Sequence, residues 1–143
     1  MKKLLTLPVT IFLLILLSSC SNYQGEPIEP NENNMIINIK NNANFDFHSI
    51  EIDANPKNGG GSTGGGSNAD GSKIKKGESL RFEYIAQEDF NLEGEATFDI
   101  VLLGKNKDKI PLKEITLELT TNKEYYFEIT GDSKKDAVIK RVK

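Results

Sequence analysis

Alternation of apolar and polar residues is the feature that most constrains the fold of this chain. A period of two is typical of a half-buried β-strand, whose successive side chains point to opposite faces. The clear pattern recurs in five segments: MIINIK (35–40), SLRFEY (79–84), EATFDIVLL (95–103), EITLELT (114–120) and EYYFEIT (124–130). Two further strands with a less regular pattern are expected at FHSIEID (47–53) and DAVIKRV (136–142), the first with a bulge near His48 or Ser49.

About seven short strands within residues 35–143 predict an all-β domain. Their number and spacing favour an immunoglobulin-like β-sandwich, with a small β-barrel as the alternative. The likeness to immunoglobulin-like domains is one of architecture only, because the single cysteine cannot form their disulfide and the chain has no tryptophan. Tyr125, at the start of a late strand after a corner, is a candidate tyrosine corner, and a plain core tyrosine would give the same pattern.

A glycine run separates the second expected strand from the third. Residues 59–66 contain six of the chain's twelve glycines. Gly59, Gly61 and Gly64 match the spacing of the dinucleotide-binding fingerprint, but that motif opens a helix, and here a strand follows. We therefore expect a flexible, solvated loop over residues 56–72. Its repeat-like composition would also suit an inserted linker.

Three lysines, Lys73, Lys75 and Lys76, follow the glycine run as a small basic cluster. Such a cluster fits a solvated turn, and it would also suit contact with anionic lipid or a teichoic-type polymer. The loops on either side of the run do not meet the calcium-loop template, since Lys57 stands where a carboxylate or amide is needed. We expect no metal site and no cofactor.

The first twenty residues, MKKLLTLPVTIFLLILLSSC, have the parts of a secretory signal peptide: two lysines, a charge-free run from Leu4 to Leu17, and small residues before Cys20. The run is shorter than the roughly 20 residues that a membrane-spanning helix needs. The last four positions, Leu17 to Cys20, resemble the lipobox of bacterial lipoproteins. This resemblance implies cleavage between Ser19 and Cys20 and a lipid attached to Cys20. An ordinary signal peptide with an incidental cysteine is the alternative.

These features divide the chain into three parts. Residues 1–19 are the expected lipoprotein signal peptide, residues 20–34 the lipidated cysteine and a disordered tether, and residues 35–143 the β-domain. The tether has two prolines and three glutamates without a positive charge, which favours an extended, unfolded chain. Two or more acyl chains hold a protein stably at a membrane. We expect the extracytoplasmic face of a bacterial cell membrane, Gram-positive in preference to an outer membrane.

The sequence offers few groups for catalysis. His48 is the only imidazole, and Cys20 is consumed if the lipobox is used. Glu118 and Glu128 fall on successive expected strands and could face each other as a carboxylate pair. Their outward positions fit a solvated face as well. We therefore expect a protein that is not an enzyme, with a small envelope hydrolase using carboxylates or His48 as the alternative.

Charge and size narrow the class of function further. The net charge of −3 and the absence of a basic excess argue against nucleic-acid binding, which needs clustered Lys and Arg. A two-lobed solute-binding lipoprotein would need a longer chain. The expected function is a lipid-anchored binding or interaction module of the cell envelope. The expected partner is an envelope protein, a wall polymer, or a secreted toxin or protease, and the sequence leaves its identity and the oligomeric state open.

Overall fold

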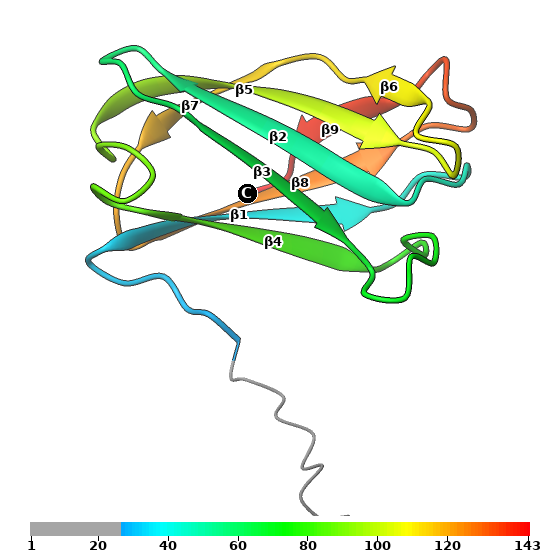
Figure 1. Cartoon of the computed structure of the whole chain (residues 1–143), viewed down its shortest axis with the longest axis horizontal. Helices are drawn as coiled ribbons and strands as arrows, with labels where there is room; N and C mark the ends of the chain where they lie inside the picture. Colours follow the sequence, from blue (N-terminus) through cyan, green and yellow to red (C-terminus); the bar gives the residue numbers. More distant parts are fainter. Residues whose placement is uncertain (1–26) are drawn as a thin grey trace, which may run out of the picture.

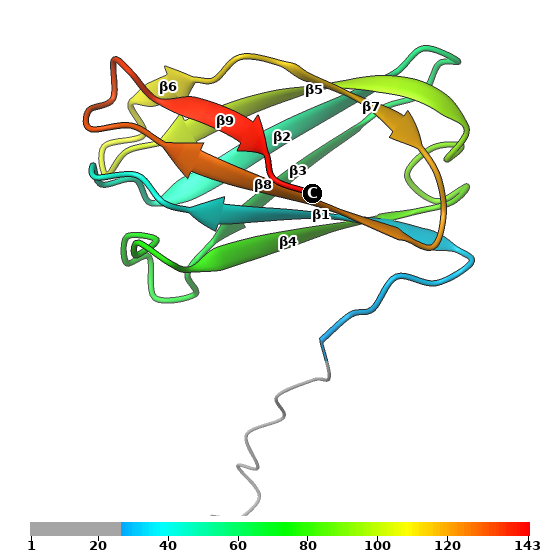
Figure 2. The ribbon, with the colours of Figure 1, turned by 180° about the vertical axis from the view of Figure 1, so that it is seen from behind.

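The computed structural model describes residues 27–143. The predicted signal peptide, the Cys20 lipidation site and the tether up to residue 26 lie outside the described residues. Nine β-strands form two sheets that share one core, which confirms the predicted β-sandwich (Figures 1 and 2). Within residues 27–143, no helix is long and apolar enough to cross a membrane.

The first sheet has the strand order β4-β1-β8-β9. Its second strand in this order, β1, runs antiparallel to β4 and parallel to β8. The four strands are β1 (Asn34–Asn41), β4 (Ser79–Ile85), β8 (Lys123–Thr130) and β9 (Val138–Arg141).

The second sheet is built around β5, which pairs with β2 on one side and with two short strands in succession on the other. Strand β3 lies at the far edge, paired with β2. The five strands are β2 (Ser49–Pro56), β3 (Ser62–Ser67), β5 (Gly94–Leu103), β6 (Lys109–Pro111) and β7 (Ile115–Leu119).

The alternation of the sequence explains how the core forms. In β5, the four inward side chains are each at most 1 % exposed, whereas Asp99 between them faces solvent. Because side chains alternate along a strand, one register buries the whole apolar set at once. These four residues are Ala96, Phe98, Ile100 and Leu102.

Strands β3 and β6 were not expected from the sequence. The interpretation of residues 56–72 as a loop is wrong for Ser62–Ser67, which pairs with β2 along its whole length. Glycine permits this strand because a Cβ atom on Gly66 would come within 3.1 Å of Leu80 and 3.2 Å of Phe82. Close approach of β3 to β4 therefore needs a residue without a side chain.

Two boundaries also differ from the expectation. Asn34, assigned to the tether, begins β1, is 1 % exposed and donates its side-chain amide to Glu83 at 2.6 Å. The ordered domain thus reaches back to Asn31, whose backbone N–H donates to the Asn34 side chain. The expected bulge is replaced by a loop: β2 begins at Ser49, and Phe47 enters the core from the preceding loop.

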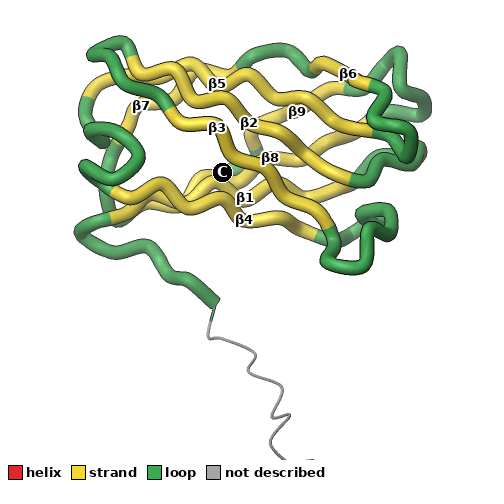
Figure 3. The backbone as a smooth tube through the Cα atoms, viewed as in Figure 1, coloured by secondary structure: helices red, strands yellow, loops and turns green. Residues whose placement is uncertain are grey.

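The connecting loops gather at two ends of the sandwich (Figure 3). One end consists of loops 42–48, 68–78, 104–108 and 131–137. It carries seven lysines and six carboxylates, and we call it the lysine-rich end. The opposite end consists of segments 27–33, 57–61, 86–93 and 120–122. It carries five carboxylates and one lysine, and we call it the acidic end; the described chain enters β1 there (Figure 1).

Candidate functional site

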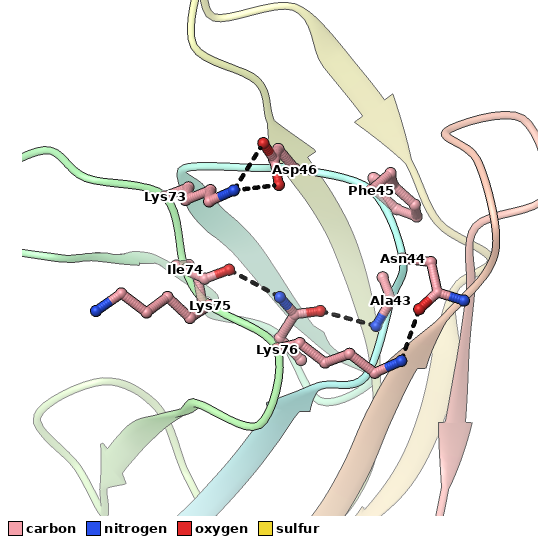
Figure 4. A pocket seen from close by; sticks show the side chains of 9 residues that line it. Ala43, Asn44, Phe45, Asp46, Lys73, Ile74, Lys75 and Lys76 are labelled. Carbon is pink, nitrogen blue, oxygen red and sulfur yellow. Dashed lines mark hydrogen bonds and ion pairs between the residues drawn. The ribbon is translucent and has the colours of Figure 1, made fainter.

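The lysine-rich end contains two shallow hollows that meet at residues 44–46. The first, of about 360 Å³, lies between loops 42–48 and 68–78 and includes all three lysines of the predicted cluster (Figure 4). The second, of about 510 Å³, lies between loops 42–48, 104–108 and 131–137. Together they make an open surface rather than a closed cavity.

Asn41 fixes the two loops that form the first hollow. Its side chain is 3 % exposed, donates to the Ile74 carbonyl at 2.8 Å and accepts from the Ala43 N–H at 2.9 Å (Figure 4). A buried amide that is satisfied on both sides holds its neighbours in one arrangement. The hollow is therefore preformed by the domain.

The three lysines of the cluster have different surroundings. Lys73 forms an ion pair with Asp46, at 2.9 and 3.0 Å to the two carboxylate oxygens, and Lys76 donates to Asn44 at 2.6 Å. The Lys75 ammonium extends away from these contacts (Figure 4). It takes part in no ion pair within residues 27–143. One cation of the cluster is thus free to meet an external anion.

The second hollow adds an aromatic ring and further lysines. Phe45 is half-buried, packs its ring 6.0 Å from that of Phe47 and lines both hollows. Lys105 and Lys134 lie on the far wall, where Lys134 pairs with Asp108 at 2.5 Å. This part of the site leaves no local pattern in the sequence, because loops distant along the chain form it.

Two aspartates of this end, Asp108 and Asp136, have lowered pKa values. A hydrogen bond from Lys134 lowers the pKa of Asp108. Bonds from the Ser133 hydroxyl and from the backbone N–H of Asp132 lower the pKa of Asp136. A donor to a carboxylate stabilises its ionised form. These acids therefore act as partners and loop caps rather than as proton donors.

The other predicted site residues are not brought together. Glu118 lies on β7 in the second sheet and Glu128 on β8 in the first, so the predicted pairing of these carboxylates on neighbouring strands is wrong. Strand β8 follows β7 along the chain but crosses to the opposite sheet. His48 lies in the second hollow with its Nδ1 3.1 Å from the Gly71 carbonyl oxygen. Among the described residues, no three His, Cys, Asp or Glu side chains cluster to hold a metal ion.

Tyr125 has the contact that defines a tyrosine corner. Its hydroxyl donates to the backbone carbonyl of Glu118 at 2.5 Å, and the residue is 1 % exposed. Lys123 and Arg141 lie over its ring, each 4.8 Å from the centroid. Of the two interpretations that the sequence left open for Tyr125, this hydrogen bond fits the tyrosine corner, and it ties β7 of one sheet to β8 of the other.

Comparisons with known proteins reveal weak structural likenesses. No family model matches the chain, and no curated protein does. The human-specific toxin intermedilysin superposes with a TM-score of 0.42 at 8 % identity, covering 76 % of this chain and 23 % of the toxin. Pneumolysin superposes with a TM-score of 0.41 at 9 % identity, covering 76 % of this chain and 23 % of pneumolysin. A protein from Eubacterium rectale superposes with a TM-score of 0.40 at 13 % identity, covering 80 % of this chain and 94 % of that protein. The chain spans about a quarter of each toxin, and scores at this level do not assign it to a family.

Proposed function

We propose that this protein is a lipid-anchored, non-enzymatic binding module of the bacterial cell envelope that meets its partner through the lysine-rich end. The observation that carries this proposal is that the chain enters the sandwich at one end and the hollows lie at the opposite end. The described chain enters at the acidic end (Figure 1). The preformed hollows are lined by loops of the opposite end. A tether from Cys20 would therefore hold the acidic end nearest the membrane and leave the lysine-rich end pointing outward.

The length of the sandwich supports this orientation. Strand β5 has ten residues, which at about 3.3 Å per residue span roughly 33 Å. Charges in physiological salt are screened over about 8 Å. The lysines of the far end would thus lie beyond the range of lipid headgroup charge, and they would remain available to a partner outside the membrane.

The chemistry of the lysine-rich end favours a partner with an extended, negatively charged surface. Its hollows are open, and they combine a half-buried aromatic ring with several lysines. Two of these, Lys75 and Lys105, form no ion pair within residues 27–143. Aromatic and cationic groups on a rigid surface suit recognition of another macromolecule better than capture of a small molecule, which needs an enclosing pocket. We expect an envelope protein, an anionic wall polymer or a secreted toxin or protease.

The proposal is tested by partner recovery from intact cells with matched lysine variants. Lys75→Gln combined with Lys105→Gln removes two exposed ammonium groups from the lysine-rich end. Lys113→Gln combined with Lys140→Gln removes two exposed ammonium groups from elsewhere on the domain. After cross-linking in cells and affinity isolation, we expect the first pair to lose the partner and the second to retain it.

The anchor needs its own control. Cys20→Ala should move the protein out of the membrane fraction, because acylation then has no thiol. Equal partner recovery with both lysine pairs would contradict binding at the lysine-rich end. Hydrolysis of an envelope substrate that His48→Ala abolishes would contradict the non-enzymatic role.

A further inference from the structure

The turn that joins β2 to β3 contains Asn58 followed directly by Gly59, the only Asn-Gly succession in the chain. Both residues are exposed. The backbone N–H of Gly59 donates to the Pro56 carbonyl at 3.2 Å, so the hydrogen bond that closes this turn is a long one. The turn is thus open to solvent and lightly held.

An asparagine side chain can react with the backbone of the residue that follows it. In this turn, the backbone nitrogen of Gly59 would attack Cγ of Asn58 and form a cyclic imide. The bond from Cγ to the side-chain nitrogen breaks, and ammonia leaves with the proton that the backbone nitrogen loses. Water then opens the ring at either carbonyl and gives aspartate or isoaspartate. Because both groups belong to one chain, the reaction depends mainly on their geometry.

Gly59 leaves the attacking nitrogen accessible. Glycine has no side chain to crowd its own nitrogen, and its backbone can adopt many conformations. The φ angle of Gly59 is 89°, in the region that favours glycine. A Cβ atom at this position would meet no atom within 4 Å. The described neighbours therefore leave room for the ring to close.

A similar succession, Asp70-Gly71, is protected by its surroundings. The Asp70 carboxylate accepts from the backbone N–H of Ser72 at 2.9 Å, and hydrogen bonds from the Ser72 hydroxyl and backbone lower the pKa of Asp70. The Gly71 N–H donates to the Asn68 carbonyl at 2.9 Å, and the Gly71 carbonyl oxygen lies 3.1 Å from His48 Nδ1. An ionised carboxylate resists attack by an amide nitrogen, so the structure separates a reactive turn from a protected one.

We propose that Asn58 is a site of spontaneous deamidation, at which a neutral amide becomes a carboxylate with time. The Asn58 amide donates to the Glu93 carbonyl at 3.4 Å, and a Cβ atom on Gly94 would come within 3.1 Å of its nitrogen. The side chain thus links the β2–β3 turn to the start of β5. A carboxylate only accepts hydrogen bonds, so it would repel this carbonyl. Conversion therefore frees the turn from β5 and adds a negative charge to the acidic end.

Strand β3 should respond most strongly to this change. Among the described strands it pairs with β2 alone, and Ser62–Ser67 has no large apolar side chain to hold it. Isoaspartate also adds a carbon atom to the backbone of the turn that sets the register of this pair. Segments with few buried apolar contacts open most readily. Amide hydrogen exchange in β3 should therefore accelerate as Asn58 is converted.

The test follows the full chain in detergent micelles by peptide mass spectrometry. Trypsin releases residues 58–73 as one peptide, which contains Asn58 together with Asn68 and Asp70 as internal controls. We expect its mass to rise by about one dalton with time, as NH₂ is replaced by OH, with fragment ions placing the change at Asn58. The rate should rise about tenfold per pH unit, because the attacking nitrogen must lose its proton. Asp70 should yield no isoaspartate.

Three variants separate the reaction from its consequence. Asn58→Gln keeps an amide, but its longer side chain needs a larger ring that closes more slowly, so the mass change should disappear. Asn58→Asp has the charge of the product from the start and should accelerate amide exchange in Ser62–Ser67. Asn42→Asp places the same charge at an exposed position in loop 42–48 and should leave this exchange unchanged.

The acetylated and amidated peptide NPKNGGGST, residues 55–63, supplies the rate without the fold. Asn58 that stays unmodified in the folded chain once this peptide is fully converted would overturn the inference, as would equal conversion at Asn68. Unaltered exchange of β3 in Asn58→Asp would overturn the proposed link between Asn58 and the hairpin. None of these results depends on the membrane anchor or on the lysine-rich end, so the proposed function stands or fails separately.

Discussion

Two buried tyrosines allow one substitution to be made in two opposite environments. The Tyr125 hydroxyl donates to the Glu118 carbonyl at 2.5 Å, whereas the Tyr84 hydroxyl has no partner in the described residues. Tyr84→Phe removes a polar group that folding takes out of water without compensation, so it should raise the free energy of unfolding by about 1–3 kcal/mol. Tyr125→Phe removes a hydrogen bond and should lower it by about 1 kcal/mol.

The two variants should therefore differ by about 2–4 kcal/mol in the free energy of unfolding. At about 4 °C per kcal/mol for a domain of this size, their melting temperatures should differ by roughly 8–16 °C. Because the chain has no tryptophan, urea unfolding followed by far-UV circular dichroism is the suitable assay. If Tyr84→Phe is destabilised as much as Tyr125→Phe, the Tyr84 hydroxyl has a hydrogen-bond partner, which would refute the presence of an unsatisfied buried group at this position.

Three further predictions concern the same domain. Gly66→Val should lower the free energy of unfolding in urea by about 1–3 kcal/mol, because its side chain would press on Leu80 and Phe82. Gly64→Val should raise it by about 0.5–1 kcal/mol, because a side chain there meets no neighbour within 4 Å of its Cβ atom. Equal effects of the two substitutions would contradict the described packing. Hydrogen bonds lower the pKa of Asp136 in the folded state, so Asp136 stabilises the fold at pH values above its unfolded-state pKa of about 3.9. This stabilisation is lost as the pH falls further. The urea concentration at the unfolding midpoint should therefore decline below about pH 4, and it should decline less in Asp136→Ala. Burial, together with the charges of Asp89 and Asp53, raises the pKa of Tyr84. The free energy of unfolding should therefore fall as the pH rises above about 10, where the unfolded chain loses this proton first. An equally steep fall in Tyr84→Phe would exclude Tyr84 as its cause.

Most of the fold could be predicted because side-chain periodicity reports one-sided burial. All seven expected strands have a counterpart, including β9, whose alternation is short. Strands β3 and β6 carry no such signal: Ser62–Ser67 has no apolar side chain, and Lys109–Pro111 is only three residues long. A strand that is held by its neighbour's backbone and by close packing leaves little trace in hydrophobic patterning.

The candidate site was predictable only in part. Lys73, Lys75 and Lys76 stand together in the sequence, so their cluster could be recognised. Phe45 and Lys134 join them through the way the loops converge at one end, which follows from strand order and not from local pattern. Alternation also does not report which sheet a strand enters. The predicted pairing of carboxylates on β7 and β8 failed for that reason.

The measurement that tests the central claim most directly is the position of the two ends of the domain relative to the membrane. Cys20 is the only native thiol, and the proposed lipidation would consume it, so Asn106→Cys at the lysine-rich end and Glu88→Cys at the acidic end could each be labelled singly. In intact cells, both should react with a membrane-impermeant maleimide. In vesicles with a lipid-attached quencher, a fluorophore at residue 88 should be quenched more strongly than one at residue 106. Labelling only after cell lysis, or stronger quenching at residue 106, would contradict an anchored module that presents its lysine-rich end to a partner.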